Sequence, residues 1–349
     1  MPTFPELEKC LLRLVTMLRD ADRMVNALGG ALMMKQFVEG IEWRELPAGE
    51  YDCCVAAVDS SFAAFETRLC VVYAVQGLAL GPNGTAVKGA DAGIILYSPS
   101  VEQGRFKVSP KRVVSAIAQL LEVELVSKAM EDSGGADYAL MDGSALSFLM
   151  SRVGKVLSER VVSSVVRGSN IEVSTICRAK LRRLTQLASK AVFVAKSSGL
   201  SLAIEGLSEL GPLVAPDLSM LEIARLAKVE PLYRAGMSKL FRVKIEGRVA
   251  KLLGLDEYDL EILRSRGLDV VTILYVRIRD GVPAFQVSML GEVDEARARE
   301  IVRCLARWSP LGYPIPLESV HRLSKMSRKM VKNLLRALTP AVSGREVIE

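Results

Sequence analysis

Residues 53–62 read CCVAAVDSSF, an apolar run that reaches Asp59 and then two serines. A short apolar run followed by small polar residues is typical of a buried strand that ends in a turn. TRLCVVYAVQGLAL (67–80) predicts a second, longer strand, and AGIILYSP (92–99) predicts a third after the GPNG turn (81–84). Because the three strands follow one another closely, we expect them to pair as an antiparallel meander.

A helix and a fourth strand complete this block. Ser109-Pro110 begins a predicted helix over KRVVSAIAQLLEVELVSKAMED (111–132), since proline is well tolerated in the first helical turn. ADYALMDGSAL (136–146) then predicts a strand that ends at Gly143. The order is β-β-β-α-β, in which the first and fourth strands can lie side by side. The sequence therefore predicts an α/β fold with a mixed sheet.

Carboxylates occupy the predicted strand ends and the helix between them. Asp59 ends the first strand and Asp142 ends the fourth, so the two side chains would meet. Glu122 and Glu124 are about 200° apart on a helix, and only one of them can face the sheet. The stripe of apolar side chains has Glu124 in its middle and Glu122 on the opposite side. We therefore expect Glu124 to face the sheet.

Three such carboxylates would repel one another unless they hold divalent metal. Oxygen ligands favour Mg²⁺ or Mn²⁺ over zinc, and two ions about 4 Å apart can drive phosphodiester hydrolysis. There is an alternative for each residue taken alone. A strand-end aspartate is commonly a turn former or an N-cap, and a glutamate on an apolar helix face is often a half-exposed edge residue.

The remaining segments alternate between helix and strand patterns. We predict helices over 148–166, 175–190 and 293–308, a buried strand in AVFVAKSSGLS (191–201), and a hairpin over 269–290 that turns at Asp280-Gly281. Residues 205–258 are charged, lean toward helix and contain several turn breakers, so we expect an insertion that projects from the core. A basic helix near the C-terminus closes the chain.

Composition indicates a folded protein with a polyanionic partner. The 349 residues are 50% hydrophobic and 25% charged, and the formal net charge is +6. Charged residues interrupt the apolar pattern of residues 1–30, which predicts an amphipathic helix and not a signal peptide. Glycine and proline break the longest weakly charged run, 69–87, so we expect no membrane span and a cytoplasmic protein. The six cysteines lack CxxC spacing and are expected to be reduced core thiols.

Six blocks of sequence resemble the NurA nucleases in their order along the chain. The resemblance covers roughly residues 50–325, and its most specific block combines a tyrosine, two prolines and the only histidine of the chain. The blocks are VAAVDSS (55–61), LLEVEL (120–125), ALMDGSAL (139–146), VFVAKSSGLS (192–201), TILYVRIRDGVPAFQV (272–287) and GYPIPLESVH (312–321). The resemblance implies an RNase H-like core.

The resemblance also implies roles for individual residues. Asp59, Glu124 and Asp142 resemble the family's metal ligands, and Tyr313 and His321 resemble its C-terminal active-site pair. His321 would ligate the second metal or bond to a phosphate, and Tyr313 would orient the nucleotide or the attacking water. Lys196 matches a lysine block and is either a contact to the scissile phosphate or an ordinary strand-end lysine. One departure is Ser60, where the family usually has glycine.

The implied activity is manganese-dependent DNA cleavage during double-strand-break end resection and homologous recombination. It would combine 5′ to 3′ exonuclease activity on single- and double-stranded DNA with single-strand endonuclease activity, through two Mn²⁺ ions or through Mg²⁺. The implied partners are DNA ends, the hexameric ATPase HerA and a second copy of the chain. Basic side chains predicted to contact DNA are Arg178, Arg182, Arg183 and Lys325. The alternatives are a non-catalytic DNA clamp or adaptor for the motor and a metal-dependent phosphatase.

The sequence divides the chain into four regions. Residues 1–48 form a helical region for dimer or HerA contacts. Residues 49–204 and 259–325 form the RNase H-like nuclease core with flanking helices, and residues 205–258 form a helix-rich insertion within it. Residues 326–349 form the C-terminal basic helix and tail.

Overall fold

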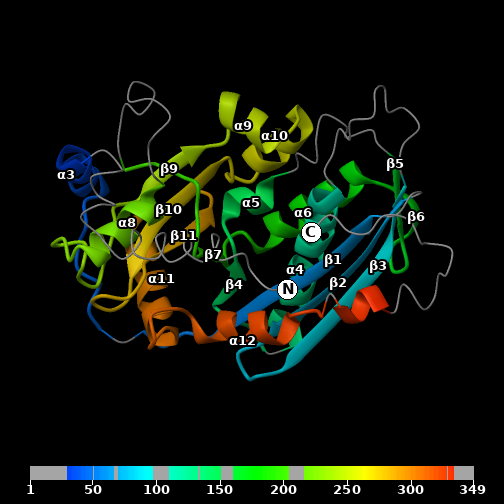
Figure 1. The fold of residues 1–349 in the computed structure, drawn as a ribbon, viewed down its shortest axis with the longest axis horizontal. Coiled ribbons are helices and arrows are strands. Elements are labelled where there is room, and N and C mark those ends of the chain that lie inside the picture. The colour runs from blue at the N-terminus through cyan, green and yellow to red at the C-terminus, as the bar shows by residue number, and fades with distance from the viewer. Residues whose placement is uncertain are drawn as a thin grey trace, which may run out of the picture.

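One large mixed sheet runs through the protein, and helices cover both of its faces (Figure 1). The computed structural model describes residues 30–49, 51–66, 70–96, 110–132, 134–150, 160–203, 216–327 and 329–333. Eleven strands of these residues form the sheet, ten of them in the order β6-β5-β3-β2-β1-β4-β7-β11-β10-β8, while β9 pairs with β10.

The strands are β1 (Val55–Glu66), β2 (Cys70–Leu80), β3 (Ala86–Leu96), β4 (Tyr138–Asp142), β5 (Arg160–Ser164), β6 (Gly168–Glu172), β7 (Ala191–Ala195), β8 (Gly236–Met237), β9 (Phe241–Lys244), β10 (Val270–Arg277) and β11 (Phe285–Leu290). The helices are α3 (Gly30–Ile41), α4 (Pro110–Asp132), α5 (Ala145–Leu149), α6 (Val173–Leu187), α8 (Asp217–Leu226), α9 (Gly247–Leu253), α10 (Glu257–Arg264), α11 (Glu295–Trp308) and α12 (Ile315–Ser324).

The predicted β-β-β-α-β block is confirmed. Strands β1, β2 and β3 form an antiparallel meander, α4 follows, and β4 pairs with β1 in parallel. The expected end of the first strand is wrong, because β1 continues past Asp59 and pairs with β2 as far as Glu66. The parallel pairing with β4 stops at Val58 and Met141, so Asp59 is the first residue of β1 beyond the paired stretch and lies level with Asp142, the last residue of β4.

Helices pack on both faces of the sheet near Asp59. Apolar side chains of α4 and α6 pack on one face of the sheet, and side chains of α11 and α12 pack on the other. Glycines allow α4 to lie very close to β2 and β3. A Cβ atom added at Gly77 would lie 2.8 Å from Leu125 Cδ1, and one added at Gly89 would lie 2.9 Å from Leu121 Cδ1. Leucine side chains of α4 therefore pack directly on the backbone of β2 and β3 at this point.

Two predicted helical regions contain strands. Within 148–166, α5 ends at Leu149 and β5 begins at Arg160, with residues 151–159 outside the described part of the chain. The β-branched pair Val161-Val162 and the turn at Gly168, whose φ is +92°, favour the β5–β6 hairpin over a helix. Within 205–258, α8 and α9 are helical as predicted. The region does not simply project, because β8 and β9 pair with β10.

The other downstream predictions agree with the structure. The hairpin is formed by β10 and β11, β7 is fully buried, and α6 and α11 cover most of the predicted helical ranges. The predicted N-terminal helix, residues 1–29, lies outside the described residues, as does the chain after residue 333. Residues 329–333 of the predicted C-terminal basic helix are helical. No helix among the described residues is long and apolar enough to cross a membrane.

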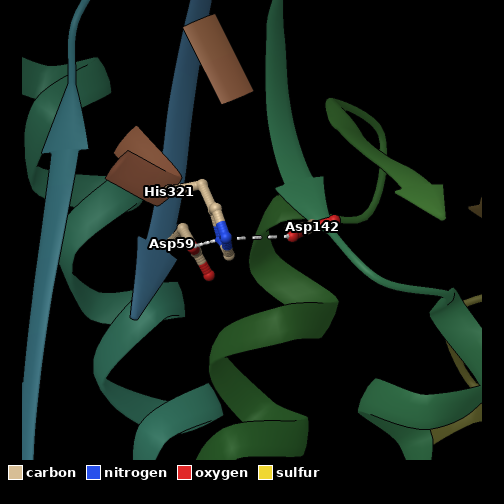
Figure 2. Close-up of side chains that lie close together, drawn as sticks. All are labelled: Asp59, Asp142 and His321. Carbon is tan, nitrogen blue, oxygen red and sulfur yellow. Dashed lines mark hydrogen bonds and ion pairs between the residues drawn. The ribbon is translucent and has the colours of Figure 1, made fainter. Parts of the chain in front are cut away.

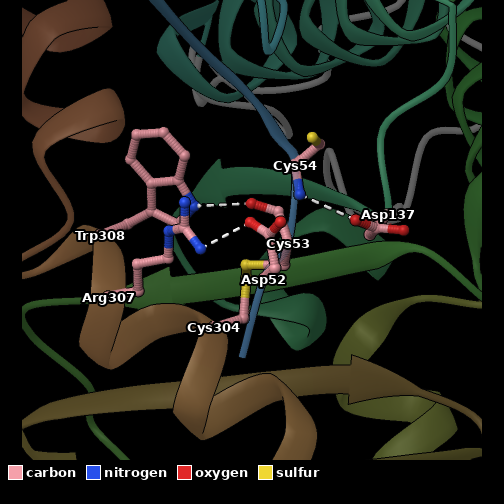
Figure 3. The surroundings of a disulfide bond; sticks show 7 residues. All are labelled: Asp52, Cys53, Cys54, Asp137, Cys304, Arg307 and Trp308. Carbon is pink, nitrogen blue, oxygen red and sulfur yellow. Dashed lines mark hydrogen bonds and ion pairs between the residues drawn. A yellow bond between two sulfur atoms is a disulfide. The ribbon is translucent and has the colours of Figure 1, made fainter. Parts of the chain in front are cut away.

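Two cysteines expected to be reduced form a disulfide between Cys53 and Cys304 (Figure 3). They are 251 residues apart in sequence, so no local pattern indicates the pairing. Neighbouring contacts join the same two segments. Arg307 pairs with Asp52 at 2.6 Å, and Trp308 Nε1 donates to the Cys53 carbonyl oxygen at 3.3 Å. These links fasten the segment just before β1 to the second half of α11.

Candidate metal centre

Consecutive side chains of β1 point to opposite faces of the sheet and contact different helices. Asp59 faces α12, where its Oδ2 lies 2.7 Å from His321 Nδ1 (Figure 2). Ser61 faces the same way and donates a hydrogen bond to the Ser324 carbonyl oxygen at 2.5 Å. Ser60 faces the other way and donates to Glu122 Oε1 of α4. The centre of β1 therefore touches both helical layers within three residues.

Helix α12 carries His321 to Asp59. Pro314 is the N-cap and Pro316 lies in the first turn, where a proline costs no hydrogen bond. The helix begins at Ile315 and ends at Ser324, so His321 lies in its last turn. Ser324 anchors the same end, because its Oγ donates to Asp59 Oδ2 at 3.3 Å and its carbonyl oxygen accepts from Gln76. The half-exposed imidazole thus faces solvent on one side and Asp59 on the other.

Asp142 completes a group of three possible metal ligands. It is the last residue of β4, and Gly143 follows with a φ of +112°, a conformation that favours glycine. Asp142 Oδ2 lies 4.0 Å from His321 Nδ1. Asp59, Asp142 and His321 each offer one ligand atom, and these atoms all lie within 4.8 Å of one another. Two carboxylates and one imidazole suit a divalent cation such as Mn²⁺ or Mg²⁺.

Tyr313 and Lys196 form the adjoining wall. The Tyr313 hydroxyl donates to Asp142 Oδ1 at 3.1 Å, and Phe285 packs edge-on against the tyrosine ring. Lys196 directly follows β7, and its Nζ lies 3.9 Å from the centroid of the Tyr313 ring. Burial, and then the charge of Asp142, raise the pKa of Tyr313. The hydroxyl therefore stays protonated and acts as a hydrogen-bond donor.

The structure corrects the predicted helix face of α4. Glu122 is buried and points toward β1, whereas Glu124 pairs with Arg167 at 2.9 Å beside the β5–β6 hairpin. Arg167 also lies 3.8 Å from the buried Asp91. Helix α4 is covered by the sheet on one side and by α6 on another, so most of its residues are buried. An apolar stripe on such a helix does not identify the face toward the sheet.

The acidic groups share a low-polarity environment. Burial raises the pKa of Asp59, and the charge of Asp142 adds to the rise, while the hydrogen bond with His321 opposes it. Burial also raises the pKa of Glu122 to about 8, and the charges of Asp59 and Asp142 add to this rise. A bound cation would relieve the repulsion, so the electrostatics fit a metal centre.

Lys180 of α6 is a buried cation. Its ammonium group donates to Gln119 Oε1 at 2.9 Å and to the Met150 carbonyl oxygen at 3.2 Å. Burial lowers the pKa of Lys180 to about 8, although the charges of Cys177 and Glu122 oppose the shift. The sequence contains a signal for this burial, because Lys180 shares one face of α6 with the apolar residues Cys177 and Leu184.

Two of the residues predicted to contact DNA also bond to helix α10 or to its N-cap. Arg178 pairs with Asp256 at 2.9 Å, and Arg182 donates to the Tyr258 hydroxyl at 2.6 Å. Arg183 is exposed on α6, and Lys325 is exposed directly after α12, close in sequence to His321. Of the four predicted residues, Lys325 is the one that immediately follows an element of the metal centre.

The fold and the acidic group define a mixed α/β protein with a candidate divalent-metal site beside the end of β4. Comparisons agree with this class. The family model for the NurA domain matches residues 54–326. The DNA double-strand break repair nuclease NurA of Saccharolobus solfataricus is 27% identical over 298 residues, which cover 81% of this chain and 80% of that protein. Because the family model matches most of its length, the chain belongs to the NurA family.

Solved NurA structures share the fold. The crystal structure of the NurA nuclease from Sulfolobus solfataricus superposes with a TM-score of 0.64 at 20% identity, covering 98% of this chain and 100% of that one. A crystal structure of NurA with manganese gives a TM-score of 0.63 at 15% identity, covering 96% and 99%. One of NurA bound to dAMP and manganese gives 0.57 at 15% identity, covering 97% of each chain.

The buried pair Glu122 and Lys180 predicts a minimum of stability near pH 8 in the metal-free protein. Folding raises the pKa of Glu122 from 4.5 to about 8, so the folded protein binds more protons and its free energy of unfolding falls as pH rises through this window. Folding lowers the pKa of Lys180 from 10.5 to about 8, so the free energy of unfolding rises again above pH 8.

Urea denaturation in EDTA from about pH 5 to about pH 10 measures this profile. Glu122→Gln should flatten the acidic limb, and Lys180→Met should flatten the basic limb. A wild-type profile that rises steadily from pH 5 to pH 8 would contradict the prediction.

Proposed function

We propose that this protein is a metal-dependent nuclease that cleaves DNA and acts in double-strand-break repair. The observation that carries the proposal is the convergence of Asp59, Asp142 and His321 within 4.8 Å of one another, beside the buried Glu122. The similarity to a DNA double-strand break repair nuclease and to NurA structures with manganese and with dAMP supports the same chemistry.

The roles follow from the contacts of each side chain. Asp59, Asp142 and His321 would hold the metal, and Glu122 replaces Glu124 as the third carboxylate of the site. When bound, a divalent cation activates water and stabilises the leaving oxygen. Tyr313 donates to Asp142 and fixes the direction of that carboxylate. Lys196 lies over the Tyr313 ring, from which its ammonium group can reach the phosphate of a bound strand.

The half-exposed imidazole has a second role in this proposal. Nδ1 bonds to Asp59, which leaves Nε2 directed away from that carboxylate. Since the two ring nitrogens lie on opposite sides of the imidazole, His321 can hold Asp59 and still bind a ligand or a phosphate oxygen. This arrangement explains why the only histidine of the chain lies beside a buried aspartate.

The finer activity is proposed from the family resemblance. It comprises 5′ to 3′ exonuclease action on single- and double-stranded DNA, single-strand endonuclease action, and a two-ion mechanism with Mn²⁺ or Mg²⁺. The proposed partners are HerA and a second copy of the chain. The non-catalytic adaptor predicts that DNA binding persists without cleavage.

A cleavage assay tests the proposal directly. End-labelled single- and double-stranded DNA is incubated with wild type, Asp59→Asn or His321→Ala, in EDTA, Mg²⁺ or Mn²⁺, with and without the HerA motor. We expect cleavage only with metal and a loss of about 100-fold or more in both variants, the effect of removing a metal ligand. Glu131→Gln, which changes an exposed carboxylate near the end of α4, serves as the matched surface control.

Two outcomes separate the alternatives. DNA binding without cleavage in every condition would support the adaptor. Cleavage of mononucleotides that is stronger than cleavage of DNA, with little dependence on salt, would support the phosphatase, because contacts to many phosphates make binding fall steeply with salt.

A further inference from the structure

Ser60 lies between two parts of the metal centre. Its neighbour Asp59 contacts His321 on α12, while the Ser60 hydroxyl donates to Glu122 Oε1 on α4. Because consecutive side chains of a strand point to opposite faces, one short stretch of β1 holds acidic groups from both helical layers. Ser60 therefore connects Glu122 to the strand that carries Asp59.

The close approach of α4 makes this contact possible. Ser60 pairs in register with Gly77 of β2. A Cβ atom at Gly77 would lie 2.8 Å from Leu125 Cδ1 and 3.4 Å from Leu121 Cδ2, so a larger residue would push α4 away from the sheet. With glycine there, Glu122 comes within reach of a side chain as short as serine.

The buried Glu122 depends on this donor. Glu122 is only 7% exposed, and a buried carboxylate without a hydrogen bond is strongly disfavoured. Among the described residues, the hydrogen bond found at the Glu122 carboxylate comes from Ser60. Lys180, the nearby cation, directs its donors to Gln119 and to the Met150 carbonyl oxygen instead. The direction of the Glu122 carboxylate is thus set from the side of β1.

We propose that Ser60 is a positioning residue that holds Glu122 Oε1 and leaves Oε2 for the metal centre, and that it thereby sets the affinity for divalent cations. The inference rests on the proposed function, because it assigns Glu122 to that centre. Hydrogen-bond partners of metal-binding groups typically change metal affinity by about 10–100-fold when they are removed.

Calorimetric titration of Mn²⁺ into the metal-free full-length protein tests this role without DNA. We expect Ser60→Ala to weaken Mn²⁺ binding by about 10–100-fold. Ser60→Thr, which keeps the hydroxyl, should bind Mn²⁺ with an affinity near that of wild type. In the cleavage assay, Ser60→Ala should raise the Mn²⁺ concentration needed for half-maximal rate and leave the rate at saturating Mn²⁺ near that of wild type.

The control is Ser127→Ala on α4, the helix that carries Glu122. It removes a hydroxyl that donates to the Val123 carbonyl oxygen. It should bind Mn²⁺ like wild type. Unchanged Mn²⁺ affinity in Ser60→Ala, an equal loss in Ser127→Ala, or wild-type affinity in Glu122→Gln would each overturn the inference. Weakened Mn²⁺ binding in Ser60→Ala, in a protein that never cuts DNA, would support the role of Ser60 and overturn only the nuclease proposal.

Discussion

Glu122→Gln is expected to lower metal-dependent DNA cleavage by about 100-fold, whereas Glu124→Gln retains it. The two residues lie two positions apart on α4, on roughly opposite sides of the helix, and their surroundings differ. Glu122 is buried against β1, beside the charges of Asp59 and Asp142. Glu124 forms two hydrogen bonds with Arg167, at 2.9 and 3.2 Å, and shares that arginine with Asp91. Its role is to fasten the β5–β6 hairpin to α4.

The pair is a matched experiment, because both substitutions replace a carboxyl group with an amide of nearly the same volume. Cleavage of labelled DNA in Mn²⁺ gives the rates, and urea denaturation gives the stability. Glu124→Gln should lower the free energy of unfolding by about 1 kcal/mol, as expected for a partly exposed ion pair. If Glu124→Gln abolished cleavage without changing stability, and Glu122→Gln cut normally, the sequence-based choice of Glu124 would be right after all.

Removal of the Cys53–Cys304 disulfide is expected to lower the free energy of unfolding by about 3 kcal/mol. The bond closes a loop across 251 residues of sequence, and cross-links over long loops restrict the unfolded chain most. Both half-cystines are buried, so reductant should act mainly on the unfolded protein. Urea denaturation of Cys53→Ala/Cys304→Ala, compared with oxidised and with reduced wild type, measures the loss.

Cys54→Ala is the control, because Cys54 is exposed and lies next to the disulfide without joining it. It should unfold at the same urea concentration as wild type. Peptide mapping without reductant should recover a linked pair of peptides that contain Cys53 and Cys304. The prediction fails if no such pair is found, or if reductant destabilises the double variant as much as wild type.

Local patterns predicted the parts of the fold that local interactions determine. The meander, α4, the Asp280-Gly281 hairpin and α11 each depend on periodicity or turn chemistry within a few residues, and all agree with the structure. The β5–β6 hairpin and the pairing of β8 and β9 depend on partners far along the chain. No pattern within 148–166 or 205–258 specifies those partners.

The same distinction applies to the metal centre. Asp59, Asp142, Tyr313 and His321 were predicted, and the structure brings them together, because strand order and the Tyr-Pro segment fix their positions. That Glu122 faces β1 was not predicted, because α4 is buried on more than one side and hydrophobicity alone does not reveal which face meets the sheet. Ser60 carried a usable signal, since a hydroxyl beside Asp59 offers a donor to a buried carboxylate.

The distance in sequence between Asp59 and His321 has a consequence for synthesis of the protein. The two residues are 262 positions apart in the sequence. Ribosomes release the N-terminal part first, so β1 through β4 emerge long before His321. The nascent chain therefore lacks the complete group of Asp59, Asp142 and His321 until α12 has emerged, and a site assembled in this way forms only after β1 through β11 have been synthesised.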